Sequence, residues 1–123
     1  MLDIRIKTIP QKEHRYDTSG DWWFTNRQKT RVEVRVSDLG NPDHEFLLGL
    51  HELVEMWLCR KRGIAQRAVD RFDMAYEKKR RADDDTEPGD DPRAPYYREH
   101  QFACGIERLM AAELGIDWQE YEG

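Results

Sequence analysis

The chain has 123 residues, of which 37% are charged and 11% are aromatic, and its formal net charge is −5. This length predicts a single domain over residues 1–123, and the aromatic content excludes a disordered chain. The acidic balance argues against general affinity for nucleic acid or for an anionic membrane. Charges interrupt the apolar residues at positions 1–10 and elsewhere, so we expect neither a signal peptide nor a membrane span of about 18 apolar residues.

The two cysteines, Cys59 and Cys104, are isolated from each other and from any CxxC spacing, and each lies in a predicted helix. A free cysteine usually behaves as a small buried apolar residue, and thiols persist in reducing compartments. We therefore expect two free thiols in a cytoplasmic protein, with a single disulfide between them as the alternative.

The first third of the chain predicts strands between about residues 2 and 37. Apolar and charged residues alternate at residues 2–7 and 32–36, which is the period of a half-buried strand. The aromatic segment Trp22–Thr25 follows a turn-like sequence and predicts a hairpin, giving a small, mostly antiparallel sheet. Three consecutive aromatic residues cannot all face one side of a strand. We expect an aromatic surface for a partner or a second copy there, unless a helix covers the second face. These residues are Trp22, Trp23 and Phe24.

The rest of the chain predicts three main helices, at about residues 42–62, 66–80 and 96–114, and hence an α+β fold. Asn41 is placed as the N-cap of the first helix, and Gly63 follows its end. The second and third helices are separated by the acidic, proline-containing segment 81–95. This segment has few groups to bury, so we expect it to be the most mobile internal part of the chain.

The first predicted helix contains the sequence LLGLHELVEMWLC, which is almost entirely apolar but includes His51, Glu52 and Glu55. At about 100° per residue, apolar residues form one broad face, and others fall outside it, which predicts a central helix. The broad face comprises Phe46, Leu50, Leu53, Val54 and Trp57. His51 and Glu55 lie one turn apart where this face ends. Buried carboxylates are costly unless they are paired or bind a metal.

The three polar residues form the pattern HExxE. Residues at i and i+4 point the same way, so His51 and Glu55 can bind one metal ion. Glu52, next to the first ligand, can accept a proton from a water molecule at the metal. The alternative is a helix whose histidine and glutamates face water or pair with arginine.

A catalytic zinc site needs a third protein ligand, and His100 is our candidate. It follows a segment long enough to bring the third helix back against the first. Glu99 and Glu107 are the expected outer partners of the ligands, and Glu99 and His100 could exchange roles. The alternative for His100 is a surface or capping histidine. Imidazole ligands favour zinc over magnesium.

The segments LLGLHELVEMWLCRKRGI and PYYREHQFACGIERLMAAELGIDW, within residues 41–118, resemble small phage and prophage proteins of unassigned function that carry an HExxE helix. They are also similar to a minimal zincin, in which an active-site helix follows a few strands and a later helix bears the third ligand. The resemblance implies that His51 and Glu55 bind zinc and that Glu52 is the general base of a hydrolase, such as a peptidase, with a peptide or small-molecule substrate. The chain departs from zincins in having Glu55 where histidine is usual and in lacking an extended signature after it.

A second pattern combines Glu52 and Glu55 with Asp70 and Asp73 on the next helix, and four carboxylates could hold Mg²⁺. This set resembles the all-α nucleotide pyrophosphatases related to MazG, which would leave the predicted strands and the histidines without a role. The simpler alternative is that Asp70, Asp73 and Glu77 form a solvated face. A third class is a phage binding or structural protein without enzymatic activity.

Overall fold

The computed structural model describes residues 1–81, 84 and 86–122. Its sheet contains β1 (Asp3–Ile9), β2 (Gly20–Phe24) and β3 (Arg31–Ser37). The helices are α1 (Pro42–Lys61), α2 (Gln66–Lys78), α3 (Tyr97–Glu113) and the short α4 (Trp118–Glu122), and the 3-10 turn η2 spans Pro88–Asp90. The predicted α+β class, with a small N-terminal sheet and three main helices, is confirmed, and in the described residues no strand lies beyond Ser37. None of the described helices combines the length and apolarity that crossing a membrane requires.

The sheet is mixed, with the strand order β1-β3-β2. β2 and β3 form the predicted antiparallel hairpin, in which Trp22 pairs with Val34. β1 runs parallel to β3, and its Ile6 also lies beside Val34. The expectation of a mostly antiparallel sheet was therefore wrong for β1. The period of two identifies a strand but not its direction, and here β3 inserts between two strands that precede it in the chain.

The two faces of the sheet differ in character. Trp22 and the valines of β3 join the core beneath the helices, and Trp22 is only 3% exposed. Trp23 lies on the outer face, half-buried below the guanidinium groups of Arg15 and Arg35 at 4.8 and 5.5 Å from its ring centre. Phe24 is also half-buried. Of the three aromatic residues, one thus enters the core and two are half-buried, and their use as a surface for a partner or a second copy stays a prediction.

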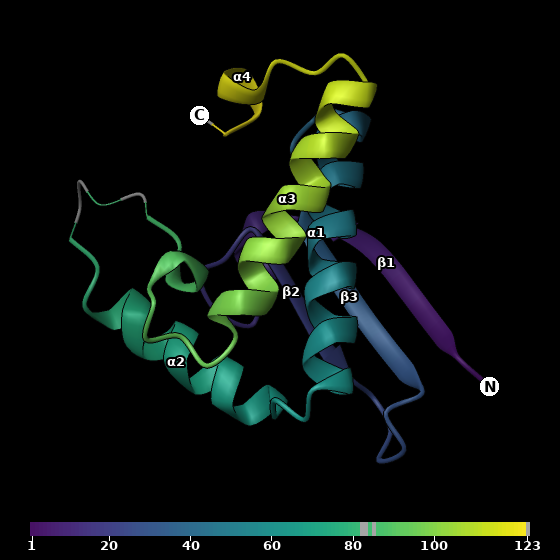
Figure 1. The fold of residues 1–123 in the computed structure, drawn as a ribbon, viewed down its shortest axis with the longest axis vertical. Coiled ribbons are helices and arrows are strands. Elements are labelled where there is room, and N and C mark those ends of the chain that lie inside the picture. Colours follow the sequence, from purple (N-terminus) through teal and green to yellow (C-terminus); the bar gives the residue numbers. More distant parts are fainter. Residues whose placement is uncertain (82–83, 85, 123) are drawn as a thin grey trace.

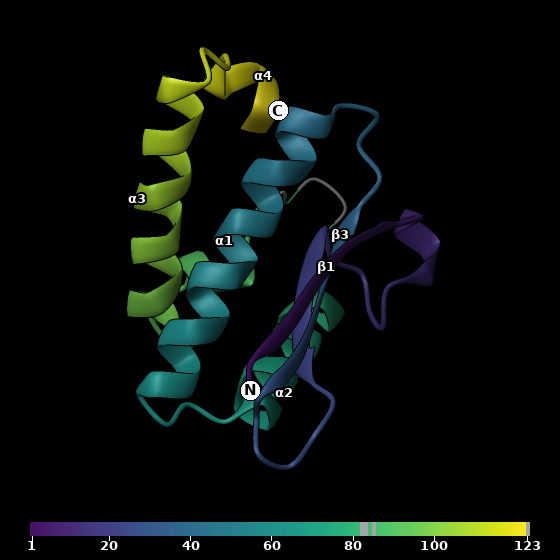
Figure 2. The same cartoon turned by 90° about the vertical axis from the view of Figure 1, so that its right-hand side faces the viewer.

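Helix α1 lies between the sheet and α3, and α2 and η2 lie at one side of these three layers (Figures 1 and 2). The predicted boundaries of α1 are set by its caps. The side chain of Asn41 accepts hydrogen bonds from the backbone N–H groups of Asp43 and His44. Gly63 follows the helix with a φ of 71°, in the left-handed region that favours glycine. Helix α3 runs antiparallel to α1, as its colour gradient shows in Figure 1.

The broad apolar face predicted for α1 is only partly turned toward solvent, since Leu53 packs against the core. Phe46 and Trp57 are 52% and 39% exposed. The opposite, buried side carries the three polar residues of the HExxE pattern together with Leu47, Gly49, Met56 and Cys59. Periodicity shows which residues share a face of a helix, but in a helix that is apolar nearly all round it does not show which face meets the sheet.

The acidic segment 81–95 includes residues 82–83 and 85, which lie outside the described residues, so its mobility stays a prediction. Two of its described residues, Gly89 in η2 and Ala94, are buried, and Tyr96 just after the segment is 3% exposed. The chain thus returns from α2 to α3 with a turn packed against the molecule.

Helix α2 carries a buried carboxylate rather than a solvated acidic face. Asp73 is 9% exposed and accepts hydrogen bonds from the hydroxyls of Tyr16 and Tyr96. Asp70 instead pairs with Arg15 at 3.1 Å. Burial raises the pKa of Asp73 to about 7, although the two tyrosine hydrogen bonds oppose this shift.

Asp73→Asn should remove a pH dependence of stability between about pH 4 and 7. The folded state holds the Asp73 proton more tightly than the unfolded chain, so wild-type stability should fall by up to roughly 4 kcal/mol as the pH rises through this range. The substitution should remove this decline, while its amide nitrogen cannot accept the second of the two tyrosine hydrogen bonds. Urea unfolding at several pH values measures the effect, and equal pH dependence in both proteins would contradict it.

Candidate metal centre

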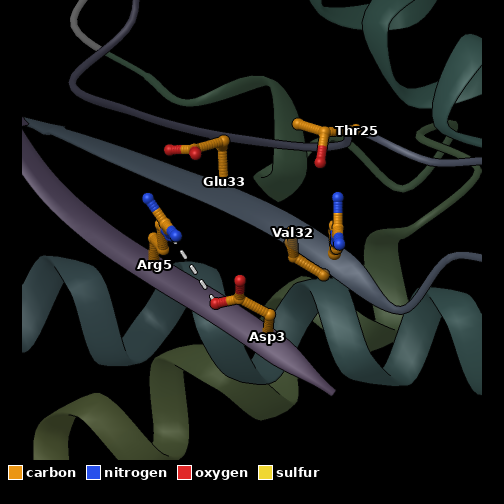
Figure 3. A pocket seen from close by; sticks show the side chains of 6 residues that line it. Asp3, Arg5, Thr25, Val32 and Glu33 are labelled. Atoms are coloured by element: carbon orange, nitrogen blue, oxygen red, sulfur yellow. Dashed lines mark ion pairs between the residues drawn. The ribbon is translucent and has the colours of Figure 1, made fainter. Parts of the chain in front are cut away.

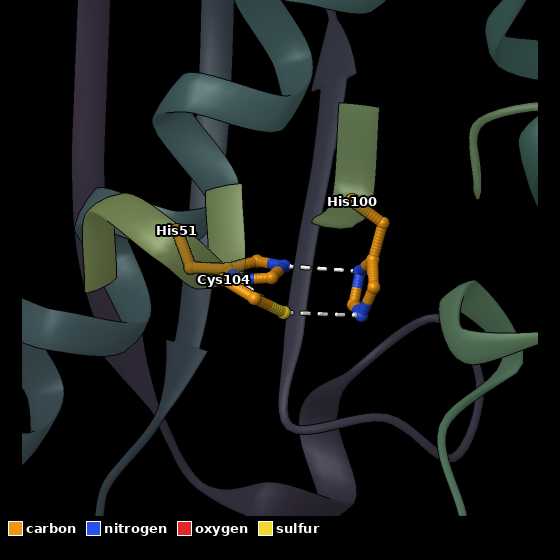
Figure 4. Close-up of side chains that lie close together, drawn as sticks. All are labelled: His51, His100 and Cys104. Carbon is orange, nitrogen blue, oxygen red and sulfur yellow. Dashed lines mark hydrogen bonds between the residues drawn. The ribbon is translucent and has the colours of Figure 1, made fainter. Parts of the chain in front are cut away.

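Three predicted side chains meet between α1 and α3. The Nε2 atom of His51 lies 3.2 Å from Oε2 of Glu55 and 3.2 Å from Nδ1 of His100. The third edge of this triangle, from His100 Nδ1 to Glu55 Oε2, is 3.0 Å. All three side chains are buried, and Figure 4 shows the two imidazoles facing each other from the two helices.

The triangle has the dimensions of three ligands around one metal ion. Zinc binds nitrogen and oxygen ligands at about 2.0–2.2 Å, so the donors of a tetrahedral site are roughly 3.3–3.5 Å apart. The observed edges of 3.0–3.2 Å are slightly shorter. A small expansion would admit the ion and leave its fourth position for water, as in catalytic sites. The donors therefore fit zinc.

The far atoms of two ligands are fixed by further hydrogen bonds. Nδ1 of His51 lies 2.8 Å from Oε1 of Glu107, whose other oxygen accepts a hydrogen bond from Tyr121. Nε1 of Trp22 donates to Oε1 of Glu55 at 3.2 Å. A histidine that donates one N–H to a carboxylate presents the lone pair of its other nitrogen, as zinc ligands do. These contacts orient His51 Nε2 and Glu55 Oε2 toward the shared point.

His100 is held in the same manner by the η2 turn. Its Nε2 atom lies 3.2 Å from Glu87 and 3.3 Å from Asp90, while Nδ1 faces His51 and Glu55. Gly89 lies directly against the imidazole, and a Cβ atom there would overlap the ring. The described part of the acidic segment therefore supplies both the hydrogen-bond partners and the steric support of this histidine.

Opposite charges balance inside the cluster. Burial lowers the pKa of His51, but its hydrogen bonds to Cys104 and to carboxylates outweigh burial and raise the pKa well above its ordinary value. The pKa of His100 is raised in the same way. Burial alone would raise the pKa of Glu55, yet the two histidines hold it below its ordinary value. A proton shared between the imidazoles and Glu55 thus neutralises this carboxylate in place of a cation, and a bound cation would displace that proton from the triangle.

Glu52 lies beside the triangle but outside it. Its side chain is 9% exposed and packs against Gly20, where a Cβ atom would overlap the carboxylate. Burial and the nearby charge of Glu55 raise the pKa of Glu52 well above its ordinary value. Among the described residues its carboxylate has no hydrogen-bond partner. A raised pKa makes this carboxylate a stronger acceptor of a proton, as a general base requires.

Cys104 contacts the outer edges of both imidazoles. Its sulfur lies 3.5 Å from Nε2 of His100 and 3.9 Å from Nδ1 of His51, opposite the nitrogens of the triangle (Figure 4). Cys104 with these histidines, and Glu87 with Asp90 and His100, are two further groups that could hold a metal ion. The contacts of the Cys104 sulfur, at 3.5 and 3.9 Å, are longer than the triangle edges, and Glu87 and Asp90 approach the other nitrogen of His100 from the exposed η2 side. Both thiols are free, so the disulfide alternative is excluded, and only Cys59 is fully buried.

The other candidate residues do not join the triangle. Glu99 is buried but forms an ion pair with Arg62 at 2.8 Å, so Glu107 alone occupies the expected outer position beside a ligand. Asp70 and Asp73 are engaged by Arg15 and by two tyrosines. Sequence reasoning missed the supporting residues, since no local pattern connects them to the HExxE helix. They are Gly20, Trp22, Glu87, Gly89, Asp90 and Tyr121.

A separate pocket of about 370 Å³ lies on the sheet (Figure 3). It is lined by Asp3, Arg5, Thr25, Arg31, Val32 and Glu33. Arg5 and Asp3 pair with each other at 3.6 Å, and none of the candidate ligands lines this pocket. It therefore contributes nothing to the chemistry of the cluster.

Comparison of the chain with models of known protein families, with curated proteins and with solved structures found no match. Function is therefore inferred from the geometry of the cluster itself.

Gly89→Ala should weaken zinc binding because its methyl group would displace the ring of His100. We expect a loss of roughly 10- to 100-fold in affinity, as for other disturbances of ligand support. Gly105→Ala is the matched control, since a Cβ atom there meets nothing within 4 Å. Competition titration with a chelating dye measures both affinities, and equal values would contradict the role of η2.

Proposed function

We propose that the protein is a zincin-like, metal-dependent hydrolase in which His51, Glu55 and His100 bind zinc and Glu52 is the general base. The observation that supports this most strongly is the triangle of donor atoms, with edges of 3.0–3.2 Å. Each of the three side chains also has a polar contact at the atom that faces away from the triangle. An ion pair with Glu55 needs only one imidazole, so it does not require all three side chains to direct a donor atom to one point. A metal ion does require it.

Zinc is the favoured metal because two imidazoles and one carboxylate form a recognised catalytic-zinc set. Magnesium prefers oxygen ligands and would make poor use of the histidines. Non-haem iron enzymes also use two histidines and a carboxylate. Glu52 favours hydrolysis over iron chemistry, because a buried carboxylate with a raised pKa beside the ligands has a direct use as a base.

When bound, zinc supplies a Lewis acid that polarises a carbonyl group and lowers the pKa of a water molecule to about 7. Glu52 then accepts the proton of the attacking water and returns it to the leaving group. Trp22 keeps Glu55 oriented through its second oxygen, and Glu107 does the same for His51. The substrate class that suits these roles is a peptide or a similar amide, and the free thiols accord with a cytoplasmic protein.

The pyrophosphatase alternative is less well supported by the contacts. It needs Asp70 and Asp73 to bind magnesium together with Glu52 and Glu55. Asp70 pairs with Arg15, and Asp73 accepts hydrogen bonds from two tyrosines. A binding or structural phage protein is the remaining alternative, and it would give the buried HExxE residues no chemical role.

Metal analysis and two substitutions test the proposal together. Protein purified without added metal should contain close to one zinc per chain. His51→Ala should weaken zinc binding by more than about 100-fold because it removes a direct ligand. Glu52→Gln should retain zinc and lower peptide hydrolysis by about 10²- to 10⁴-fold.

Gly105→Ala is again the control for metal binding, because a Cβ atom there meets nothing within 4 Å. It should retain zinc with nearly wild-type affinity. Unchanged zinc binding in His51→Ala would contradict the proposed site. Magnesium-dependent nucleotide cleavage by a zinc-free protein would favour the pyrophosphatase alternative.

Gly20→Ala should separate the base from the metal ligands. A methyl group at residue 20 would overlap the carboxylate of Glu52. The hydrogen bond from Trp22, in the same strand, to Oε1 of Glu55 would remain, so Glu55 would keep its orientation. We expect zinc affinity within about 3-fold of wild type and at least a 10-fold loss of hydrolysis. Parallel zinc titration and activity assays measure this difference, with Gly105→Ala again as the control.

A further inference from the structure

Helix α1 exposes apolar residues on one side, and Figure 2 shows a side of this helix that neither the sheet nor α3 covers. Phe46 and Trp57 are 52% and 39% exposed, and Leu50 and Val54 between them are only partly buried. The residues recur at intervals of three and four, so they lie along one face of the helix. The candidate metal centre lies on the buried side.

Helix α3, which packs along α1, also exposes apolar residues. Phe102 and Leu109 are 55% and 70% exposed, and the half-buried Ile106 lies between them at helical spacing. We call the combined surface the α1–α3 face: Phe46, Leu50, Val54, Trp57, Phe102, Ile106 and Leu109. Soluble monomers rarely expose contiguous apolar patches of more than a few hundred Å². A surface of this kind indicates a partner.

Charges at the two ends of the face indicate what the partner is. Because α3 runs antiparallel to α1, its C-terminal Glu113 lies at the same end as Asp43, at the N-terminus of α1. Lys61 and Arg98 lie at the other end. All four residues are exposed. The face is therefore acidic at one end and basic at the other.

We propose that a second copy of the chain covers the α1–α3 face in a two-fold symmetric dimer. A two-fold axis perpendicular to α1 places the acidic end of one copy against the basic end of the other, and the apolar residues meet between them. Parallel pairing would bring like charges together. Two adjacent helices of about 30 Å cover roughly 600 Å², close to the roughly 800 Å² per partner of a stable interface.

The oligomeric state of the full chain tests the dimer directly. Sedimentation equilibrium should give twice the mass of one chain. Leu50→Arg places a charge in the middle of the face and should yield a folded monomer, with folding checked by circular dichroism. Met74→Arg is the matched control, because Met74 is 42% exposed on α2, outside the face, and this variant should stay dimeric. A wild-type monomer at a concentration on the order of 100 µM would overturn the proposal.

Charge reversal tests the two-fold arrangement. Asp43→Lys and Lys61→Asp should each weaken dimerisation by roughly 3- to 10-fold, because each creates two like-charge contacts. The double variant restores opposite charges and should recover dimerisation to within about 2-fold. If the double variant is as weak as the single ones, the proposed symmetry is wrong. Zinc content should not change in any of these variants, so their outcome is independent of the proposed hydrolase.

Discussion

The ion pairing of Glu55 with His51 and His100 is the contact on which the rest of the molecule depends. Glu55 is 5% exposed, and its carboxylate lies 3.0 and 3.2 Å from imidazole nitrogens of α3 and α1. An isolated buried carboxylate is very costly, and removing one partner of a buried pair typically destabilises a protein by about 3–5 kcal/mol. The packing of α3 on α1 is thus fixed by the same groups that form the candidate site.

This coupling extends from the two helices to the other elements. β2 supplies Trp22 to Glu55 and Gly20 to Glu52. The η2 turn supplies Gly89 and two carboxylates to His100, and α4 supplies Tyr121 to Glu107. Each support comes from an element that also packs on α1 or α3. The cluster can therefore be rigid without a large hydrophobic core, which in a chain of 123 residues is limited.

The sequence revealed the parts of the site that follow from helix geometry. His51 and Glu55 are at i and i+4, so their convergence could be predicted, and the caps Asn41 and Gly63 defined the helix that carries them. Trp22 and Gly20 could not be predicted, because strand register and long-range contacts are not encoded in local periodicity. The parallel direction of β1 could not be predicted for the same reason.

The apolar composition of α1 follows from the elements that surround it. One side meets the sheet through Met56 and Cys59, and another meets α3. In the proposed dimer the third side, from Phe46 to Trp57, meets a second copy. A helix with three protein neighbours must be apolar nearly all round. Its polar residues then remain only where α1, α3 and β2 converge, where imidazole and carboxylate groups neutralise one another. The HExxE pattern within an apolar helix is the result expected of a buried ionic site in a helix that has no free face.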